Sequence, residues 1–304
     1  MEMVMRNLFQ SLAKSRAANK MAKRYGLRFG AGRFVAGETI QRAIEAVREL
    51  NREGKVVTLD HLGEFVFTEE EANESADMCL KTLDAINEAG VSSNLSLKMT
   101  SLGLDISREL CVRNMRRILD RAKAYGNFVR IDMEDFAHCQ ISFDILRELR
   151  QEYDNVGIVV QAYLYRTMQD IDDLKELRLN LRLVKGAYKE SPEVAYPEKK
   201  DVDANFRAII KRHLLNGCYA AIATHDESVI ADMKAFIKEQ GISNDQFEFQ
   251  MLFGICVDLQ NRLVEEGYRV RVYVPYGIDW FGYFMRRLAE RPANVWFVLK
   301  NMFK

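Results

Sequence analysis

Short runs of β-branched and apolar residues alternate along this chain with longer segments whose apolar residues recur at helical spacing. After a second helical pattern at 38–52, which follows the N-terminal arm, this alternation repeats eight times. The expected strands are residues 56–59, 94–98, 128–132, 157–161, 181–185, 220–223, 248–252 and 270–274. The expected helices that follow them are residues 69–89, 107–124, 139–152, 167–177, 200–216, 226–239, 256–266 and 279–290.

The order of these elements predicts the fold class. Parallel strands need a crossover between them, so strands that alternate with helices and show no hairpin signal indicate a parallel sheet. Eight repeats indicate that the sheet closes into an α/β barrel of the TIM-like (β/α)8 type, with extra N-terminal helices. We expect an N-terminal helical arm over residues 1–54 and a catalytic barrel domain over residues 55–304.

The two faces of the expected strands differ in polarity, which supports closure. In the strand 128–132, Val129 and Ile131 share one face, whereas Arg130 and Asp132 share the other. Helices cover the outside of such a barrel, so the apolar face packs against them and the polar face points inward.

Several polar residues are expected at the carboxyl ends of strands, where the active sites of these barrels lie. A buried charge without a counter-ion is costly, so we expect this mouth of the barrel to bind an anion. The residues expected there are Lys98, Asp132, Gln161, Arg182, Lys185 and Tyr273.

Composition excludes several classes of protein. Lys plus Arg and Asp plus Glu number 44 each, so no global charge favours a nucleic-acid or membrane partner. No apolar run reaches the roughly 18 residues of a membrane span, and the N-terminus lacks the apolar segment of a secretory signal. We therefore expect a cytoplasmic protein. The five cysteines form no CxxC pair and are expected to be reduced and buried.

The first 34 residues form a basic amphipathic arm, with eight lysines and arginines against the single acid Glu2. One interpretation is a solvated helix packed on the domain. The others are a peripheral contact with an anionic membrane surface and an organelle transit peptide.

Two adjacent arginines, Arg286 and Arg287, lie on the last expected helix. An arginine can bind a carboxylate through two parallel hydrogen bonds, and this pair together with Lys98 could neutralise one completely. Tyr273 and Tyr283 flank the pair, and aromatic walls beside cations suit a small substrate with an apolar ring and a charged end. A solvated arginine pair and core tyrosines fit the same pattern.

Gly186 follows the strand 181–185, where its backbone could approach a flat ligand or a phosphate. At the end of the strand 220–223, Thr224 and Glu227 match a helix capping box. His225 between them is either a core histidine or a hydrogen-bonding partner of a cofactor. The acids at 60–64 and 132–135 could supply oxygen ligands, but their spacing matches no known metal signature, and we expect no metal.

The chain has no GxGxxG, Walker, HExxH or GxSxG motif. Instead, from about Phe34 to its C-terminus it resembles the proline dehydrogenase family, particularly the short bacterial members with a single activity. The motifs that carry this resemblance are HLGE at 61–64, RIDME at 130–134, VQAY at 160–163, RLVKGAY at 182–188, ATH at 223–225, FQML at 249–252, RVYVP at 271–275 and YFMRRLAE at 283–290.

The resemblance implies a distorted barrel that binds FAD at the strand ends, oxidises L-proline to Δ1-pyrroline-5-carboxylate and passes the electrons to a quinone. This reaction is the first step of proline catabolism to glutamate. Nothing in the sequence corresponds to the second, aldehyde-oxidising domain or the DNA-binding segment of the longer bifunctional relatives. A separate pyrroline-5-carboxylate dehydrogenase is therefore implied as the downstream enzyme.

The resemblance also assigns roles by position. Asp132 and Arg182 match catalytic residues beside the flavin, and Glu64 matches an acid that pairs with Arg286 to close the site. The implied substrate-binding residues are Lys98, Tyr188, Leu252, Tyr273, Tyr283, Arg286 and Arg287. The implied FAD contacts are Met133, Gln161, Arg182, Val184, Lys185, Gly186, Ala187, Thr224, His225 and Glu290.

Two other functions fit the same strand ends. In a lyase or aldolase barrel, Lys98 or Lys185 would form a Schiff base with a keto acid. A non-catalytic barrel would bind proline without reducing any dye. A flavin absorbance band that proline bleaches would separate the dehydrogenase from both.

Overall fold

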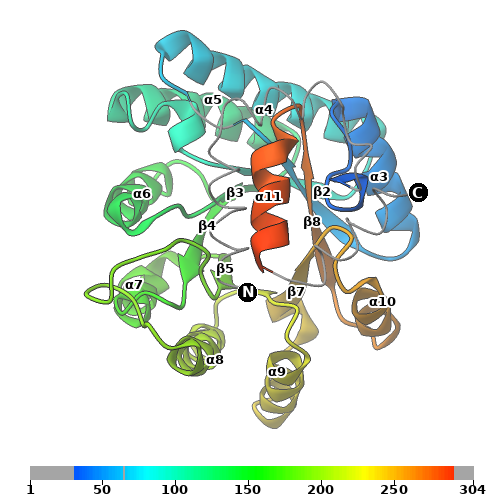
Figure 1. Ribbon diagram of the computed structural model, residues 1–304, viewed down its shortest axis with the longest axis vertical. Helices are drawn as coiled ribbons and strands as arrows, with labels where there is room; N and C mark the ends of the chain where they lie inside the picture. The colour runs from blue at the N-terminus through cyan, green and yellow to red at the C-terminus, as the bar shows by residue number, and fades with distance from the viewer. Residues whose placement is uncertain (1–30, 64–65, 291–304) are drawn as a thin grey trace.

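The computed structural model describes residues 31–63 and 66–290, with residue 31 and residues 286–290 as backbone only (Figure 1). Its parallel strands pair in chain order, and β8 also pairs with β1, so the sheet closes into a barrel. The strands are β1 (Val56–His61), β2 (Ser93–Leu97), β3 (Val129–Ile131), β4 (Val156–Gln161), β5 (Leu181–Val184), β6 (Ala220–Ala223), β7 (Phe247–Leu252) and β8 (Val270–Tyr276). The predicted (β/α)8 fold is confirmed.

Helices ring the strands, and α11 lies in front of them in the view of Figure 1. The helices are α3 (Ile40–Arg52), α4 (Glu69–Ala89), α5 (Arg108–Ala124), α6 (Phe136–Leu149), α7 (Thr167–Leu174), α8 (Lys199–Leu215), α9 (Glu227–Glu239), α10 (Val257–Glu265) and α11 (Trp280–Glu290). Short 3-10 turns are η2 (Ala31–Arg33), η3 (Thr100–Leu102), η4 (Lys175–Leu177) and η5 (Asn244–Gln246).

Local signals in the sequence explain where several helices begin. The Thr68 side chain accepts from the backbone N–H of Glu71 while the Glu71 carboxylate accepts from the backbone N–H of Thr68, which forms a capping box at the start of α4. The first helical turn of α6 begins at 136, three residues before the expected 139. The reason is Asp135, whose side chain accepts from the backbone N–H of His138 and so caps the helix earlier.

The strand faces divide as predicted. Val129 and Ile131 are fully buried in the main apolar core between the strands and the helices. On the opposite face, the Arg130 guanidinium donates to the carbonyl of Ile158 at 3.0 Å, within the barrel. The Arg271 guanidinium likewise contacts the carboxylate of Glu248 at 2.7 Å. The interior of the barrel is therefore a network of buried charged and amide side chains rather than an apolar plug.

The segment that precedes α3 packs against the far end of the chain. The backbone N–H of Ala36 donates to the carbonyl of Pro275, and that of Gly277 donates to the carbonyl of Gly37. Phe34 and Val35 are buried in a cluster with residues of α11. The remainder of the expected basic arm, residues 1–30, lies outside the described residues, so the division into an arm and a barrel domain stays a prediction.

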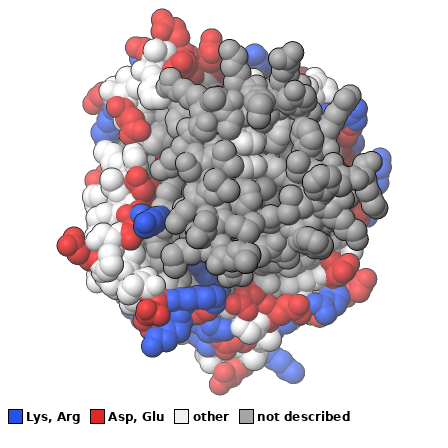
Figure 2. Space-filling model, in the orientation of Figure 1, with Lys and Arg blue, Asp and Glu red and all other residues white. Residues whose placement is uncertain are grey.

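Two further expectations concern thiols and membranes. Cys79, Cys111, Cys139 and Cys218 are buried thiols as predicted, whereas Cys256 is partly exposed. Among the helices that the structure describes, none is both long enough and apolar enough to cross a membrane. On the face shown in Figure 2, acidic and basic side chains mix around the rim.

Candidate active site

An ion pair between Asp132 and Arg182 lies at the centre of the barrel mouth. Arg182 Nη1 lies 2.5 Å from Asp132 Oδ1, and the hydroxyl of Ser96 donates to the same oxygen at 2.7 Å. Arg182 Nε donates to Gln250 Oε1 at 2.7 Å. Arg182 was expected at the rim, but it is the second residue of β5 and its buried side chain reaches Asp132 from within the barrel.

The hydroxyl of Tyr273 lies between two carboxylates at the same level. Its oxygen is 2.7 Å from Asp60 Oδ2 and 2.9 Å from Asp132 Oδ2. Lys98 Nζ lies 3.6 Å from Asp60 Oδ2, and the Arg182 guanidinium stacks 5.2 Å from the centre of the Tyr273 ring. Burial raises the pKa of Asp60, while the charge of Lys98 acts to lower it.

Carboxylates of the chain itself face the cations of the mouth. Besides the Arg182 pair, Lys185 Nζ lies 2.6 Å from Asp203 Oδ1 of α8 and 3.0 Å from Asp226 Oδ2. Lys185 holds the pKa of Asp226 below its usual value. Arg182 and Lys185 therefore meet counter-ions within the chain itself, from other strand ends and from α8.

The loop after β5 passes closely over an aromatic ring. Gly186 has φ +112°, and a Cβ at this position would lie 2.1 Å from the ring of Tyr163, so only glycine fits here. Gln161 donates through Nε2 to the carbonyl of Glu134 at 2.6 Å, whereas its Oε1 is buried with no hydrogen-bond partner among the described residues. Arg182 Nη2 is likewise buried and has no hydrogen-bond partner among the described residues. Unsatisfied buried polar atoms of this kind fit a polar ligand at the strand ends.

Thr224 and His225 hold the ends of β6 and β7 together. The backbone N–H of Leu252 donates to His225 Nε2 at 3.0 Å, which makes this imidazole nitrogen an acceptor. The Thr224 hydroxyl accepts from the backbone N–H of Asp226. The expected Thr224–Glu227 capping box is wrong, because Asp226 is the residue directly before α9 and its carboxylate accepts from the Ser228 backbone.

Three of the four residues expected to pack against a substrate ring come together. Leu252, Tyr273 and Tyr283 belong to one apolar cluster beneath α11, together with Leu62 and Trp280. The fourth, Tyr188, lies with Ala187 in the exposed loop after β5. Of the remaining expected flavin contacts, Met133 is buried in the main core and Val184 is partly buried against it.

The clamp and gate residues are only partly described. The backbones of Arg286, Arg287 and Glu290 belong to α11, which follows β8 and packs over the mouth, but their side chains lie outside the described residues. Glu64 also lies outside them. In the part of the chain that is described, no group of three or more His, Cys, Asp or Glu side chains is placed to hold a metal ion.

Sequence reasoning did not single out Gln250 or Asp203 as site residues, and it considered Asp60 only as a possible metal ligand. The place of Asp60 in the network was missed because β1 extends two residues beyond its expected end at 59. The inward polar alternation of Thr58 and Asp60, set against Val57 and Leu59, was the signal that could have found it.

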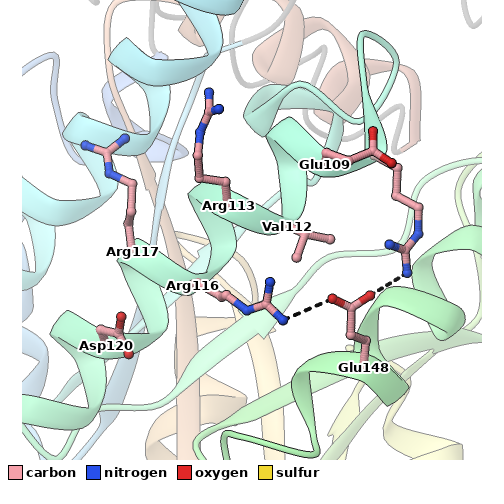
Figure 3. A pocket seen from close by; sticks show the side chains of 8 residues that line it. Glu109, Val112, Arg113, Arg116, Arg117, Asp120 and Glu148 are labelled. Carbon is pink, nitrogen blue, oxygen red and sulfur yellow. Dashed lines mark hydrogen bonds and ion pairs between the residues drawn. The ribbon is translucent and has the colours of Figure 1, made fainter.

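A second depression, with a volume of about 420 Å³, lies on the outer surface beside α5 (Figure 3). Arg108 and Arg116 line it, and both contact Glu148 of α6, at 2.6 Å and 3.1 Å. It lies outside the ring of helices, away from the strand ends, and its two paired arginines link α5 to α6.

A much smaller cavity, of about 20 Å³, adjoins Asp60, Ser96 and Lys98 at the mouth of the barrel. The polar network of the mouth, and not the larger depression, is the candidate active site.

Comparison with known proteins identifies the family of this chain. The sequence model of one family, described as proline dehydrogenase, matches residues 43–300. Proline dehydrogenase 1 of Bacillus subtilis (strain 168) is 52% identical over 99% of this chain and 100% of its own length. Proline dehydrogenase of Deinococcus radiodurans is 47% identical, over 90% of each chain.

Longer proteins match over a part of their length. The bifunctional protein PutA of Escherichia coli (strain K12) is 31% identical over 87% of this chain but 23% of its own. The crystal structure of proline utilization A from Bdellovibrio bacteriovorus, inactivated by N-propargylglycine, superposes with a TM-score of 0.81 at 27% identity, and covers 86% of this chain and 32% of that one. The full-length matches are thus to the short, single-activity type. This chain belongs to the proline dehydrogenase family of oxidoreductases.

Proposed function

We propose that this chain is an FAD-dependent dehydrogenase that oxidises L-proline to Δ1-pyrroline-5-carboxylate and passes the electrons to a quinone. The observation that carries the proposal is the polar network of Asp132, Arg182 and Tyr273 at the strand ends of a chain in this family. Such a network can orient a small polar substrate at the strand ends.

The flavin would be held at the ends of β4, β5 and β6. Buried Gln161 Oε1 and Arg182 Nη2 are available as hydrogen-bonding groups, and the backbone at Gly186 can approach a flat ring. FAD, when bound, supplies the acceptor for the two electrons and the hydrogen that leave the proline ring. The other proposed contacts are Met133, Val184, Lys185, Ala187, Thr224, His225 and Glu290.

The proline carboxylate would be bound by Lys98, Arg286 and Arg287, and the pyrrolidine ring by the apolar cluster beneath α11. In this position Leu252, Tyr273 and Tyr283 exclude water from one side of the ring. Tyr188 would cover the ring from the loop after β5. Closure of the site by Glu64 and Arg286 would complete this enclosure.

The cellular context completes the proposal. The product would pass to a pyrroline-5-carboxylate dehydrogenase as the downstream enzyme. A quinone acceptor lies in a membrane, so a cytoplasmic enzyme with a basic N-terminal arm could reach it through peripheral contact with the inner face of that membrane.

The visible absorbance spectrum of the purified protein, recorded before and after anaerobic addition of L-proline, tests the proposal. We expect a flavin band that proline bleaches. A colourless protein that borohydride links covalently to a keto acid at Lys98 or Lys185 would instead support the Schiff-base lyase. We further expect N-propargylglycine, which inactivated the Bdellovibrio relative, to inactivate this chain irreversibly.

A further inference from the structure

The position of Tyr273 between two carboxylates raises a question of proton count. Its hydroxyl oxygen lies 2.7 Å from Asp60 Oδ2 and 2.9 Å from Asp132 Oδ2. A phenol carries one proton and can donate a full hydrogen bond to one acceptor at a time. With both carboxylates ionised, one of these two close oxygen pairs lacks a proton. A proton on either carboxylate would satisfy both contacts.

The two carboxylates differ in how well the chain compensates their charge. Asp132 is in contact with Arg182 at 2.5 Å and with the Ser96 hydroxyl, and its side chain is 13% exposed. Asp60 is 2% exposed, and its cation, Lys98, stands at 3.6 Å. The ionisable groups that face Asp60 are Lys98 beyond β2, Asp132 beyond β3, Arg182 on β5, Tyr273 and Tyr276 on β8 and Cys79 on α4. The charge of Asp60 is therefore the less compensated of the two, and burial raises the pKa of this carboxyl.

Lys98 links Asp60 to the ligand. Under the proposed function, on which this step rests, the Lys98 ammonium also binds the substrate carboxylate. A ligand carboxylate would draw the ammonium, whose side chain is 20% exposed, toward the mouth. Asp60 would then remain buried but lie farther from the Lys98 ammonium, which compensates its negative charge. The affinity of the Asp60 carboxylate for a proton would therefore rise.

We propose that Asp60 takes up one proton when a carboxylate ligand binds at the mouth, and that L-proline supplies this proton from its own ammonium group. In this step an N–H bond of the substrate breaks and an O–H bond of Asp60 forms, with no change of oxidation state. The neutral amine keeps the lone pair that forms the C=N bond when the adjacent C–H hydrogen leaves with two electrons for the flavin.

The resulting arrangement satisfies every contact in the network. Protonated Asp60 donates to the Tyr273 oxygen, Tyr273 donates to Asp132, and Asp132 remains paired with Arg182. The Tyr273 hydroxyl is also the route by which the proton reaches a carboxyl as deeply buried as Asp60: it accepts from the mouth side and passes its own proton inward.

The test measures protons rather than turnover. Cyclopentanecarboxylate, a ring acid without an amine, is titrated into the flavin-loaded protein by calorimetry at about pH 7.5 in buffers of different ionisation enthalpy. We expect uptake of about one proton per site in the unsubstituted protein and about none in Asp60→Asn. The matched control is Glu134→Gln, which removes another carboxyl, half-buried and shortly after β3, and should keep the uptake.

A second measurement follows flavin reduction by L-proline in Asp60→Asn across a range of pH. The rate at neutral pH should fall about 100-fold and recover as the pH approaches that at which the free amine forms in solution. Binding without proton uptake in the unsubstituted protein, or a pH profile in Asp60→Asn parallel to that of the unsubstituted protein, would overturn the inference. If L-proline does not bleach the flavin of the unsubstituted protein, the proposed function is overturned instead. If cyclopentanecarboxylate does not bind, both the proposed carboxylate clamp and this inference are overturned. Retained flavin absorbance shows that Asp60→Asn is folded.

Discussion

Arg182 Nη1 lies 2.5 Å from Asp132 Oδ1, and both side chains lie within the barrel mouth, where little water reaches them. β5 supplies the arginine, and the aspartate follows β3, so the pair joins two strands on either side of β4. Because Arg182 also contacts Gln250 of β7, one guanidinium joins three strand ends.

We expect Arg182→Met to lower the free energy of unfolding by about 3–5 kcal/mol, because it leaves the Asp132 carboxylate buried without its arginine. Chemical denaturation monitored by circular dichroism measures this. Arg116→Met is the control: Arg116 is 39% exposed and pairs with Glu148 and Glu152 on the surface, so its loss should cost less than about 1 kcal/mol. Equal effects of the two substitutions would contradict a special role for the central pair.

Arg286→Met should raise the KM for proline about 100-fold while the flavin content stays near that of the unsubstituted protein. The reason is that the proposed role of Arg286 is to bind the substrate carboxylate, and methionine keeps an unbranched stem but has no guanidinium group and no charge. Steady-state kinetics with a dye acceptor and the ratio of flavin to protein absorbance give both quantities. An unchanged KM would refute the clamp.

Substitution of Gly186 by alanine should abolish flavin retention. The new Cβ would lie 2.1 Å from the ring of Tyr163, so the loop after β5 has to move away from the strand ends. Gly217→Ala is the control: Gly217 also has a positive φ, +71°, but lies in open space, so this substitution should cost about 1 kcal/mol of stability but no flavin. Absorbance of the purified proteins compares the two, and a fully loaded Gly186→Ala protein would count against the proposed flavin position.

Stability should fall with acidity because of His213 on α8. Burial lowers the pKa of His213 from 6.5 to about 4, and its Nε2 lies 3.0 Å from the carbonyl of Tyr219. The unfolded chain binds a proton there at a higher pH than the folded chain does. The contribution of neutral His213 to the free energy of unfolding is therefore fully present above about pH 6.5 and is lost as the pH falls toward about 4.

Between about pH 7.5 and pH 5, we expect this histidine alone to remove about 2 kcal/mol of the unfolding free energy. Denaturation at the two pH values measures the loss. In His213→Gln, which keeps a donor for the Tyr219 carbonyl, that part of the pH dependence should disappear. An identical pH dependence in the variant would show that other groups cause it.

Much of the fold could be predicted because its signals are local. The spacing of Val129, Arg130, Ile131 and Asp132 contains both the strand and the division of its faces, since side chains alternate along any extended segment. The expected first residues of helices were less accurate where the capping side chain was misassigned. Asp135 starts α6 early, and Asp226, rather than Thr224, caps α9.

For the candidate site, too, some features could be predicted from the sequence and others could not. Its residue types and their positions at strand ends were predictable, because the direction of each strand fixes which end faces the mouth. Their partners were not: the hydrogen bond from Tyr273 to Asp60 joins residues 213 positions apart. It exists because β8 pairs with β1 in one register when the barrel closes.

The sequence by itself therefore determined an eight-fold barrel and its polar interior, which follow from order and alternation along the chain, and its motifs indicated the family by resemblance. Tertiary structure decided which acid faces which cation. That choice depends on closure of the sheet, which brings distant strand ends within hydrogen-bonding distance and removes the water that would otherwise have compensated their charges.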